Sequence, residues 1–273
     1  MKSKIHLILF ISFFSVLILE TSAQQLSTKK LHQSKIHLDK VERISVDRLG
    51  GFYLTAACGL EKFDPDGHEK EKYQFRNCVA TEILEAWNPF RIYAFQKSIR
   101  AFKVYDQYLT VSEEIAIDSA VAIEPQLATP ANDNRSYWIL DVDYSVKKVD
   151  LFTSKVLIET ESIVDPSGKY HFIHAREFQN FLFLLDEREG IFVLNSVGRL
   201  VKRIDAAGAN YFSVLGEDIY FLKNNTVHFY DIYTEESYTV TVPGDTRFVV
   251  ATDEKMILIK DKALEVYAFT PRQ

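Results

Sequence analysis

The stretch with the clearest potential to bind a ligand is Trp87-Asn88-Pro89-Phe90-Arg91, which combines an aromatic ring, an amide and a guanidinium group. It joins two expected strands, so Trp87 and Arg91 would lie at the end of a sheet, where loops carry binding residues. The alternative, which the usual burial of aromatic side chains favours, is a core tryptophan beside a proline turn. We take Trp87, Asn88 and Arg91 as the candidate binding residues.

Histidines and carboxylates offer weaker candidates. His171 and His174 form the closest histidine pair, but residues three apart on a strand face opposite sides and do not share a metal ion. Asp141 and Asp143 share one strand face, a spacing that suits a hard cation, although solvent-facing carboxylates at a strand end are the simpler interpretation. Residues 132–134 lack the later glycine and glutamate of a calcium loop and are interpreted as a plain loop.

Motifs of nucleophilic, phosphate-binding and zinc-dependent catalysis are absent from the sequence. It contains no G-x-S-x-G, no P-loop, no G-x-G-x-x-G and no H-E-x-x-H. We therefore expect no catalytic residue, no metal ligand and no cofactor, although a propeller can assemble an active site from residues far apart in the chain.

Two cysteines, Cys58 and Cys78, are too few for a disulfide scaffold. In an oxidising compartment they could pair and close a loop of about twenty residues, which would stabilise the fold by ~3 kcal/mol. The expected strands place them at the ends of elements that are not nearest neighbours. A disulfide and two separate, partly buried thiols both stay open.

The N-terminus has the pattern of a secretory signal peptide. Lys2 and Lys4 precede an almost unbroken apolar run at residues 5–19, and Thr21-Ser22-Ala23 offers small residues for cleavage. The run is short for a spanning helix, and an uncleaved anchor is the alternative. We expect a signal peptide at 1–23, a polar leader at 24–34 and one domain at 35–273.

The charge of the chain after residue 23 argues against two classes of partner. Thirty Lys and Arg face thirty-seven Asp and Glu, so the net charge is about −7. Nucleic acid and anionic lipid both require clustered positive charge. We expect an exported protein without a transmembrane segment after residue 23, either free or peripheral to a membrane complex.

Apolar strands that end in a turn residue recur every 36 to 45 residues, and the period predicts a β-propeller. The strands end at Asp64, Asp106, Asp150, Asn195, Asp231 and Ala268. Second strands are expected at 52–57, 91–95, 137–142, 181–185, 218–222 and 255–259. Third strands are expected at 60–63, 99–105, 146–149, 191–194, 227–230 and 264–269. Residues 80–87 fit either a turn of helix or an innermost strand.

Six units predict an all-β, six-bladed propeller. The last unit has three strands, and the segment 35–39 has the alternation of a strand without a blade of its own. We expect this N-terminal strand to complete the last blade and close the ring, which removes a free sheet edge. Seven blades would require a further unit within residues 116–135.

Four short runs carry a resemblance to known proteins: Asn88-Pro89-Phe90-Arg91-Ile92, Lys103-Val104-Tyr105-Asp106, Tyr137-Trp138-Ile139 and Val146-Lys147-Lys148-Val149-Asp150. Together with the strand pair at 257–260 and 264–269, they resemble a family of uncharacterised, exported, propeller-like proteins of Bacteroidetes-type bacteria. The chain departs from the family at Ala86-Trp87, where Val-Ser is usual, and at Asp106-Gln107, where Asp-Asn is usual. The resemblance implies a propeller in the periplasm or outer envelope, and it implies no activity, catalytic residue or cofactor.

The function expected from these observations is a non-enzymatic binding or scaffold role in the cell envelope, with a protein partner on the propeller surface. One alternative is an enzyme of the metal-dependent lactonase or sugar-ester hydrolase kind, with its site in the central channel. Another is carbohydrate binding through Trp87 and exposed tyrosines. Analogy of fold supports all three and decides none.

Overall fold

The computed structural model of the chain describes residues 22–27 and 29–272. The predicted signal peptide at 1–23 therefore lies outside the described residues, apart from the last two, whose backbone begins strand β1 (Ser22–Gln25). Among the described residues, the regular elements are strands and a single 3₁₀ turn, η1 (Lys97–Ile99). No helix of this part of the chain is long and apolar enough to cross a membrane.

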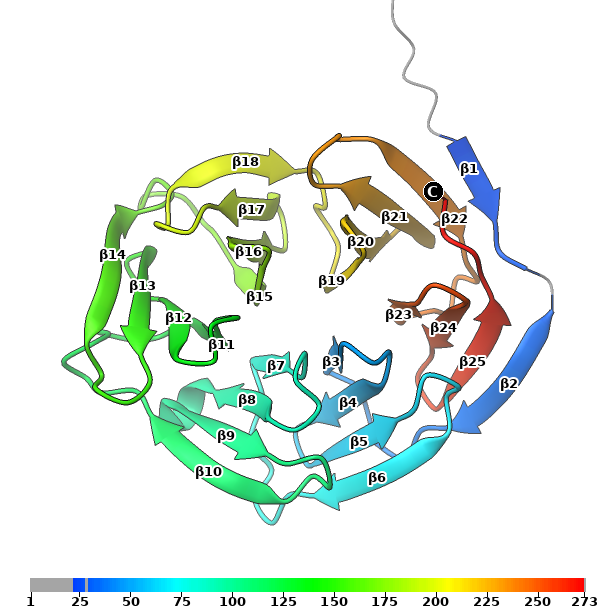
Figure 1. Cartoon of the computed structure of the whole chain (residues 1–273), viewed down its shortest axis with the longest axis horizontal. Coiled ribbons are helices and arrows are strands. Elements are labelled where there is room, and N and C mark those ends of the chain that lie inside the picture. Colours follow the sequence, from blue (N-terminus) through cyan, green and yellow to red (C-terminus); the bar gives the residue numbers. More distant parts are fainter. Residues whose placement is uncertain (1–21, 28, 273) are drawn as a thin grey trace, which may run out of the picture.

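Six sheets surround a central axis and form a six-bladed β-propeller (Figure 1), which confirms the predicted fold class. Blade 1 contains β3 (Arg43–Val46), β4 (Phe52–Ala56), β5 (Gly59–Phe63) and β6 (Glu69–Gln74). Blade 2 contains β7 (Ile83–Glu85), β8 (Ile92–Gln96), β9 (Ala101–Tyr105) and β10 (Val111–Ala116). Blade 3 contains β11 (Leu127–Pro130), β12 (Ser136–Leu140), β13 (Ser145–Asp150) and β14 (Val156–Ser162).

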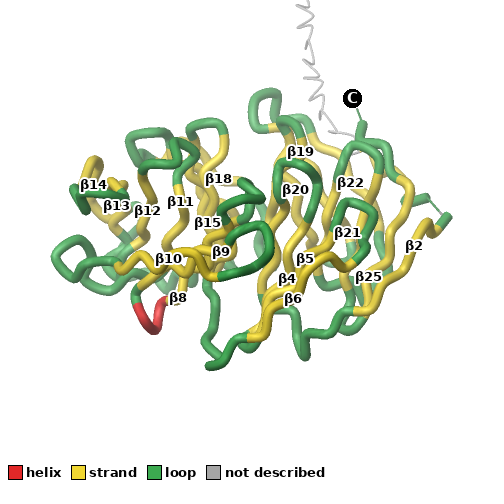
Figure 2. The backbone as a smooth tube through the Cα atoms, turned by 60° about the horizontal axis from the view of Figure 1, so that its bottom comes forward, coloured by secondary structure: helices red, strands yellow, loops and turns green. Residues whose placement is uncertain are grey.

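The remaining three blades follow the same plan. Blade 4 contains β15 (Phe172–Phe178), β16 (Phe181–Asp186), β17 (Gly190–Leu194) and β18 (Leu200–Ile204). Blade 5 contains β19 (Phe212–Leu215), β20 (Asp218–Lys223), β21 (Thr226–Asp231) and β22 (Ser237–Thr241). Blade 6 contains β23 (Phe248–Ala251), β24 (Lys255–Ile259) and β25 (Ala263–Ala268). In every blade the first strand lies innermost (Figure 1), and neighbouring strands of these sets are antiparallel. Loops join the strands around the ring, and the short η1 turn is the single helical segment of the described residues (Figure 2).

An N-terminal strand completes blade 6, but it lies earlier in the chain than we expected. The strand is β2 (Lys30–Lys35), which pairs antiparallel with β25, and the expected strand at 35–39 does not form. Ile36 is instead fully buried in the connection to blade 1. Every residue of β2 is exposed or half-buried, so its polar sequence lacks the apolar pattern that marks inner strands such as β12.

The segment 24–34 is accordingly not a strand-free polar leader. It contains most of β2 and the second half of β1, which pairs in parallel with β22 and adds a fifth strand to blade 5 (Figure 1). The N-terminal segment therefore covers the outer edges of two neighbouring blades. It protects both edges against pairing with another chain.

The hydrophobic core lies between adjacent blades, because each middle strand is covered on both faces. Strands β4, β8 and β12 are buried along their whole length, whereas β6 alternates between exposed and half-buried residues. Phe52 and Phe63 stack at 5.1 Å between ring centroids and pack with Ile257 of blade 6. Each buried phenylalanine contributes about 2–3 kcal/mol from removal of apolar surface from water.

Two expected elements differ in detail from the structure. The third strand of blade 2 begins at Ala101 rather than at 99, because Arg100 takes the left-handed conformation (φ 52°) that ends η1. The ambiguous segment 80–87 forms the innermost strand β7 and not a turn of helix.

The turn at Asp64 to Gly67 has a second role in addition to reversing the chain. Asp64 Oδ1 accepts hydrogen bonds from the backbone N–H groups of Asp66 and His68, at 3.0 and 2.9 Å. Gly67 has φ +82°, and a Cβ atom there would lie 2.7 Å from Val266 of β25. The turn of blade 1 thus packs directly on the closing blade, and glycine is the residue that fits.

Candidate functional site

The loops after the innermost strands meet at one end of the central channel, which we call the mouth (residues 47–50, 87–91, 131–134, 215–216 and 252–253). Trp87 follows β7 and is 37% exposed there. The turn after it is fixed by two hydrogen bonds to Asn88: Arg91 N–H donates to the carbonyl oxygen at 3.0 Å, and Phe90 N–H donates to Oδ1 at 3.1 Å. Local chain geometry therefore holds the candidate residues in place.

Two cavities open at the mouth, and Arg48 and Trp87 line both of them. The smaller has a volume of about 190 Å³ and is lined also by Asn88, Arg91 and Asn132. The larger has a volume of about 390 Å³ and extends over the ends of the innermost strands of blades 1, 4, 5 and 6. All three candidate residues from the sequence thus line one cavity, and Trp87 stands between the two.

The Trp87 ring is held by contacts from other blades. The guanidinium carbon of Arg176 lies 5.0 Å from the ring centroid, and Phe178 meets the ring edge to face at 6.2 Å. The backbone N–H of Trp87 donates to Glu85 Oε1 at 2.8 Å, and the backbone carbonyl oxygen of Trp87 accepts from the backbone N–H of Arg48 at 3.1 Å. The ring is therefore placed before any ligand arrives.

Arg176, on β15, links three blades across the channel. Its side chain is only 3% exposed; Nε lies 3.5 Å from Glu85 Oε2 of blade 2, and Nη1 donates to Ser213 Oγ of blade 5 at 3.2 Å. Nη2 has no hydrogen-bond partner among the described residues. Sequence reasoning missed this residue, because β15 also contains His174 and Glu177, and Arg176 does not stand out as an isolated charge in an apolar run.

Beneath Arg176 the channel is closely packed and carries positive charge. His174 is buried, and burial together with Arg176 and Arg43 lowers the pKa of its imidazole to about 3. Its ring packs against Tyr211 and Phe212 at 4.9 and 4.7 Å between centroids. A neutral imidazole beside two guanidinium groups disfavours a cation at this level of the channel.

His171 lies just before β15 and His174 within it, and their side chains have different surroundings. The side chain of His171 is 68% exposed and lies 3.0 Å from Glu187, whereas His174 points into the packed channel. They share no ligand position.

Arg91, the third candidate, is partly engaged already. Its Nη2 donates to Glu113 at 2.7 Å, and its guanidinium carbon lies 5.3 Å from the centroid of Tyr93. Arg48 differs, because its guanidinium makes no hydrogen bond or ion pair within the described part of the chain. The guanidinium without a partner among the described residues at the mouth is therefore that of Arg48, a residue that sequence reasoning did not identify.

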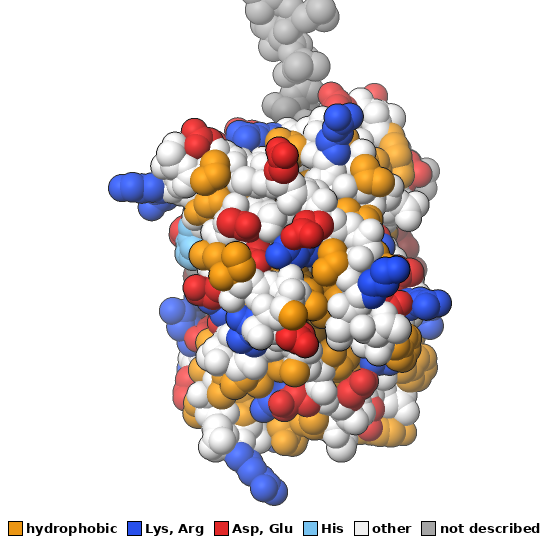
Figure 3. Space-filling model, turned by 90° about the vertical axis from the view of Figure 1, so that its left-hand side faces the viewer, with side chains coloured by type: hydrophobic (Ala, Val, Ile, Leu, Met, Phe, Trp, Pro, Cys, Tyr) orange, Lys and Arg blue, Asp and Glu red, His pale blue; other side chains and the backbone are white. Residues whose placement is uncertain are grey.

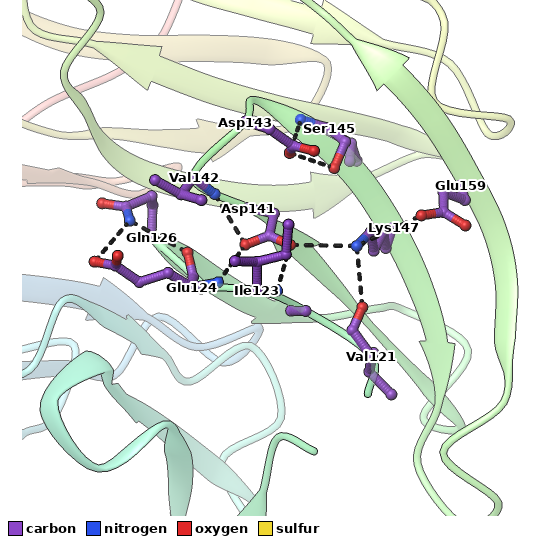
Figure 4. Close-up of polar contacts among 12 residues, drawn as sticks. Val121, Ile123, Glu124, Gln126, Asp141, Val142, Asp143, Ser145, Lys147 and Glu159 are labelled. Carbon is purple, nitrogen blue, oxygen red and sulfur yellow. Dashed lines mark hydrogen bonds and ion pairs between the residues drawn. The ribbon is translucent and has the colours of Figure 1, made fainter. Parts of the chain in front are cut away.

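Asp141 and Asp143 do not form a cation site, and Asp141 is not solvent-facing as we expected (Figure 4). Asp141 is fully buried and accepts hydrogen bonds from Ile123 and Glu124 N–H at 2.8 and 2.7 Å, and from Lys147 Nζ at 3.2 Å. Burial alone would raise its pKa, but these hydrogen bonds outweigh burial and lower it. Asp143 turns away to bind the backbone and hydroxyl of Ser145. Asp141 thus anchors the connection between blades 2 and 3.

Cys58 and Cys78 are joined by a disulfide, with their Cα atoms 4.3 Å apart. The chain beyond β6 returns across the blade, because Phe75 N–H donates to the Cys58 carbonyl and Val79 N–H donates to the Ala57 carbonyl, both at 2.9 Å. This return brings together two residues whose strands are not neighbours. The bridge lies at the end of blade 1 away from the mouth, since β4 runs antiparallel to β3.

On the side that carries β14, the outer wall of the ring shows no cluster of aromatic and basic side chains like that at the mouth (Figure 3). Acidic, basic and apolar side chains are interspersed over this face. Along β14, half-buried residues alternate with exposed ones. This face has no continuous basic stripe of the kind that nucleic acid would need.

Comparison with known proteins places the fold and goes no further. No protein-family model and no curated protein matches the sequence. Among solved structures, the chain is similar to one described as a streptogramin B lyase structure, with a TM-score of 0.56 and 12% sequence identity. The similarity covers 88% of each chain. At this identity the likeness supports the propeller fold alone.

Proposed function

We propose that this protein is a non-enzymatic binding protein that engages a protein partner at the mouth around Trp87. The observation that carries the proposal is the exposed Trp87 ring between two cavities, held on one side by Arg176 and Phe178. A side chain that is already ordered loses little conformational entropy on binding, which favours affinity.

The residue types at the mouth support a protein partner. Leu49 is 67% exposed and lines the larger cavity together with Arg48 and Trp87. Phe90 is 58% exposed and lies in the turn between Trp87 and Arg91. Tryptophan and arginine are among the types that contribute most binding energy at protein interfaces, and phenylalanine is enriched there. Their occurrence together on one face is uncommon for a surface without a partner.

The proposal includes a location in the cell envelope, either free or peripheral to a membrane complex. It is supported by the signal-peptide pattern of residues 1–23 and by the resemblance to exported propeller-like proteins. The net negative charge fits a protein partner better than an anionic membrane surface.

Site-specific photocrosslinking in the native cell tests this proposal. A crosslinkable residue replaces Leu49 at the mouth and, as a matched control, Leu157, which is 51% exposed on the outer wall. We expect one partner to be crosslinked from position 49, to be absent from position 157, and to disappear when Trp87→Ala is added.

Three results would contradict the proposal. They are equal crosslinking from both positions, crosslinking at position 49 that ignores Trp87→Ala, and Trp87-dependent binding of purified sugars without any protein partner. The last result would establish the carbohydrate-binding alternative.

A further inference from the structure

We propose that His37, Glu61 and Glu69 form a binding site for a divalent cation of the zinc class, where the N-terminal segment joins blade 1. His37 Nδ1 lies 2.8 Å from Glu69 Oε2 and 3.7 Å from Glu61 Oε1. One ligand atom from each residue lies within 4.8 Å of the other two. Around a tetrahedral zinc ion, ligand atoms at 2.0–2.2 Å from the metal are about 3.3–3.6 Å apart, so small side-chain movements suffice.

The three residues come from separate segments that the fold brings together. Glu61 lies within β5, Glu69 begins β6, and His37 follows the closing strand β2. Zinc accepts imidazole nitrogen and carboxylate oxygen as ligands, and a site with three protein ligands leaves the fourth position to water. An imidazole among the ligands favours zinc over calcium or magnesium.

Glu61 supplies an independent reason to expect a cation. Its side chain is only 2% exposed, yet no lysine or arginine pairs with it among the described residues. The backbone N–H of His37 donates to it at 3.0 Å, and the half-exposed His37 ring is the nearest cationic group. A metal ion would supply the positive charge that a carboxylate in such a buried place needs in order to be ionised.

The surroundings give the ion both access and a supporting hydrogen bond. A cavity of about 340 Å³ reaches His37 and Glu61, leaving room for a water ligand. The His37 N–H bond to Glu61 orients that carboxylate, a role that outer contacts commonly have at metal sites. Lys72 lies 3.4 Å from Glu69 and competes with the ion, so we expect micromolar rather than nanomolar affinity.

A second cluster nearby, Asp64, Asp66 and His68, serves as a control. Its ligand atoms are equally close, but Asp64 is paired with Lys70 at 3.0 Å and Asp66 with Lys255. Lysines therefore already neutralise both carboxylates, and we assign no metal to this group. His68→Ala removes a histidine from the same region without touching the proposed site.

Zinc titration of the purified protein tests the assignment by calorimetry and by thermal unfolding. We expect one zinc ion per chain and a rise in Tm of about 5–10 °C at a hundredfold excess over Kd, because the ion binds the folded state. Zn²⁺ binding should persist in His68→Ala and weaken at least tenfold in His37→Ala and in Glu69→Gln. Both of these side chains are partly exposed, so the variants are expected to fold.

Absence of zinc binding to the wild-type protein would overturn the assignment. Unchanged affinity in His37→Ala and Glu69→Gln, or loss of binding in His68→Ala, would also overturn it. None of these results depends on a partner at the mouth.

Discussion

Replacing Arg176 with methionine tests whether this side chain holds the channel and the mouth together. Methionine keeps much of the volume but leaves Glu85, whose side chain is 8% exposed, without its cation. The two groups lie 3.5 Å apart, and at an effective dielectric constant of about 20 their attraction is roughly 5 kcal/mol. Removal of one member of a buried ion pair costs about 3–5 kcal/mol, most of it from the charge left behind.

The assay is urea unfolding of four proteins: wild type, Arg176→Met, Glu85→Gln and the double variant. We expect Arg176→Met to lose about 3–5 kcal/mol of unfolding free energy, and the double variant to regain about 2 kcal/mol or more, since the glutamine that replaces Glu85 carries no charge. The hydrogen bond from Arg176 to Ser213 accounts for about 1 kcal/mol of the remaining loss.

The reasoning would be refuted by a loss below about 1 kcal/mol in Arg176→Met. It would also be refuted by a double variant whose loss equals the sum of the two single losses, because independent sites add in this way.

Three further variants test other parts of the structure by thermal or urea unfolding. Burial and acidic neighbours raise the pKa of Asp218 to about 6, so its ionisation destabilises the fold as pH rises from about 4 to 6. Asp218→Asn should therefore raise the unfolding free energy by about 1 kcal/mol at pH 7.5, after allowance for partial exposure. At pH 4 the variant and the wild type should be equally stable. Asp141→Asn should lower the unfolding free energy by about 2–3 kcal/mol at pH 7, because Lys147 loses its buried partner. The loss should shrink below pH 4, because the lowered pKa of Asp141 stabilises the wild type only while the carboxyl is ionised. Gly67→Ala should lose at least about 1–2 kcal/mol from its positive φ and from contact with Val266, and an unchanged Tm would show that the closing blade yields easily.

The six-bladed ring could be predicted because its signals are local and repeated. Strands such as β12 and β16 are apolar at all but one position, and turns such as that at Asp64 have side chains that bind their own backbone. Closure by an N-terminal strand was predicted, but at 35–39 instead of 30–35, because β2 has no fully buried residue and its polar sequence carries no apolar pattern. Only its register against β25 identifies it.

The candidate site was predictable only where its residues are consecutive. Trp87, Asn88 and Arg91 share one turn, so their proximity was already implied by the sequence. Arg48 and Arg176 reach the same tryptophan from blades 1 and 4, and only closure of the ring brings them there. The cluster around His37 depends likewise on where the N-terminal segment rests.

The most direct test of the central claim is the affinity of the crosslinked partner, once purified, for the wild-type protein and for Trp87→Ala. We expect Trp87→Ala to weaken binding at least about thirtyfold, equivalent to about 2 kcal/mol, because central tryptophans are among the residues whose truncation costs most. Leu157→Ala on the outer wall should leave the Kd unchanged. Equal Kd values for wild type and Trp87→Ala would contradict the assignment of the mouth as the binding site.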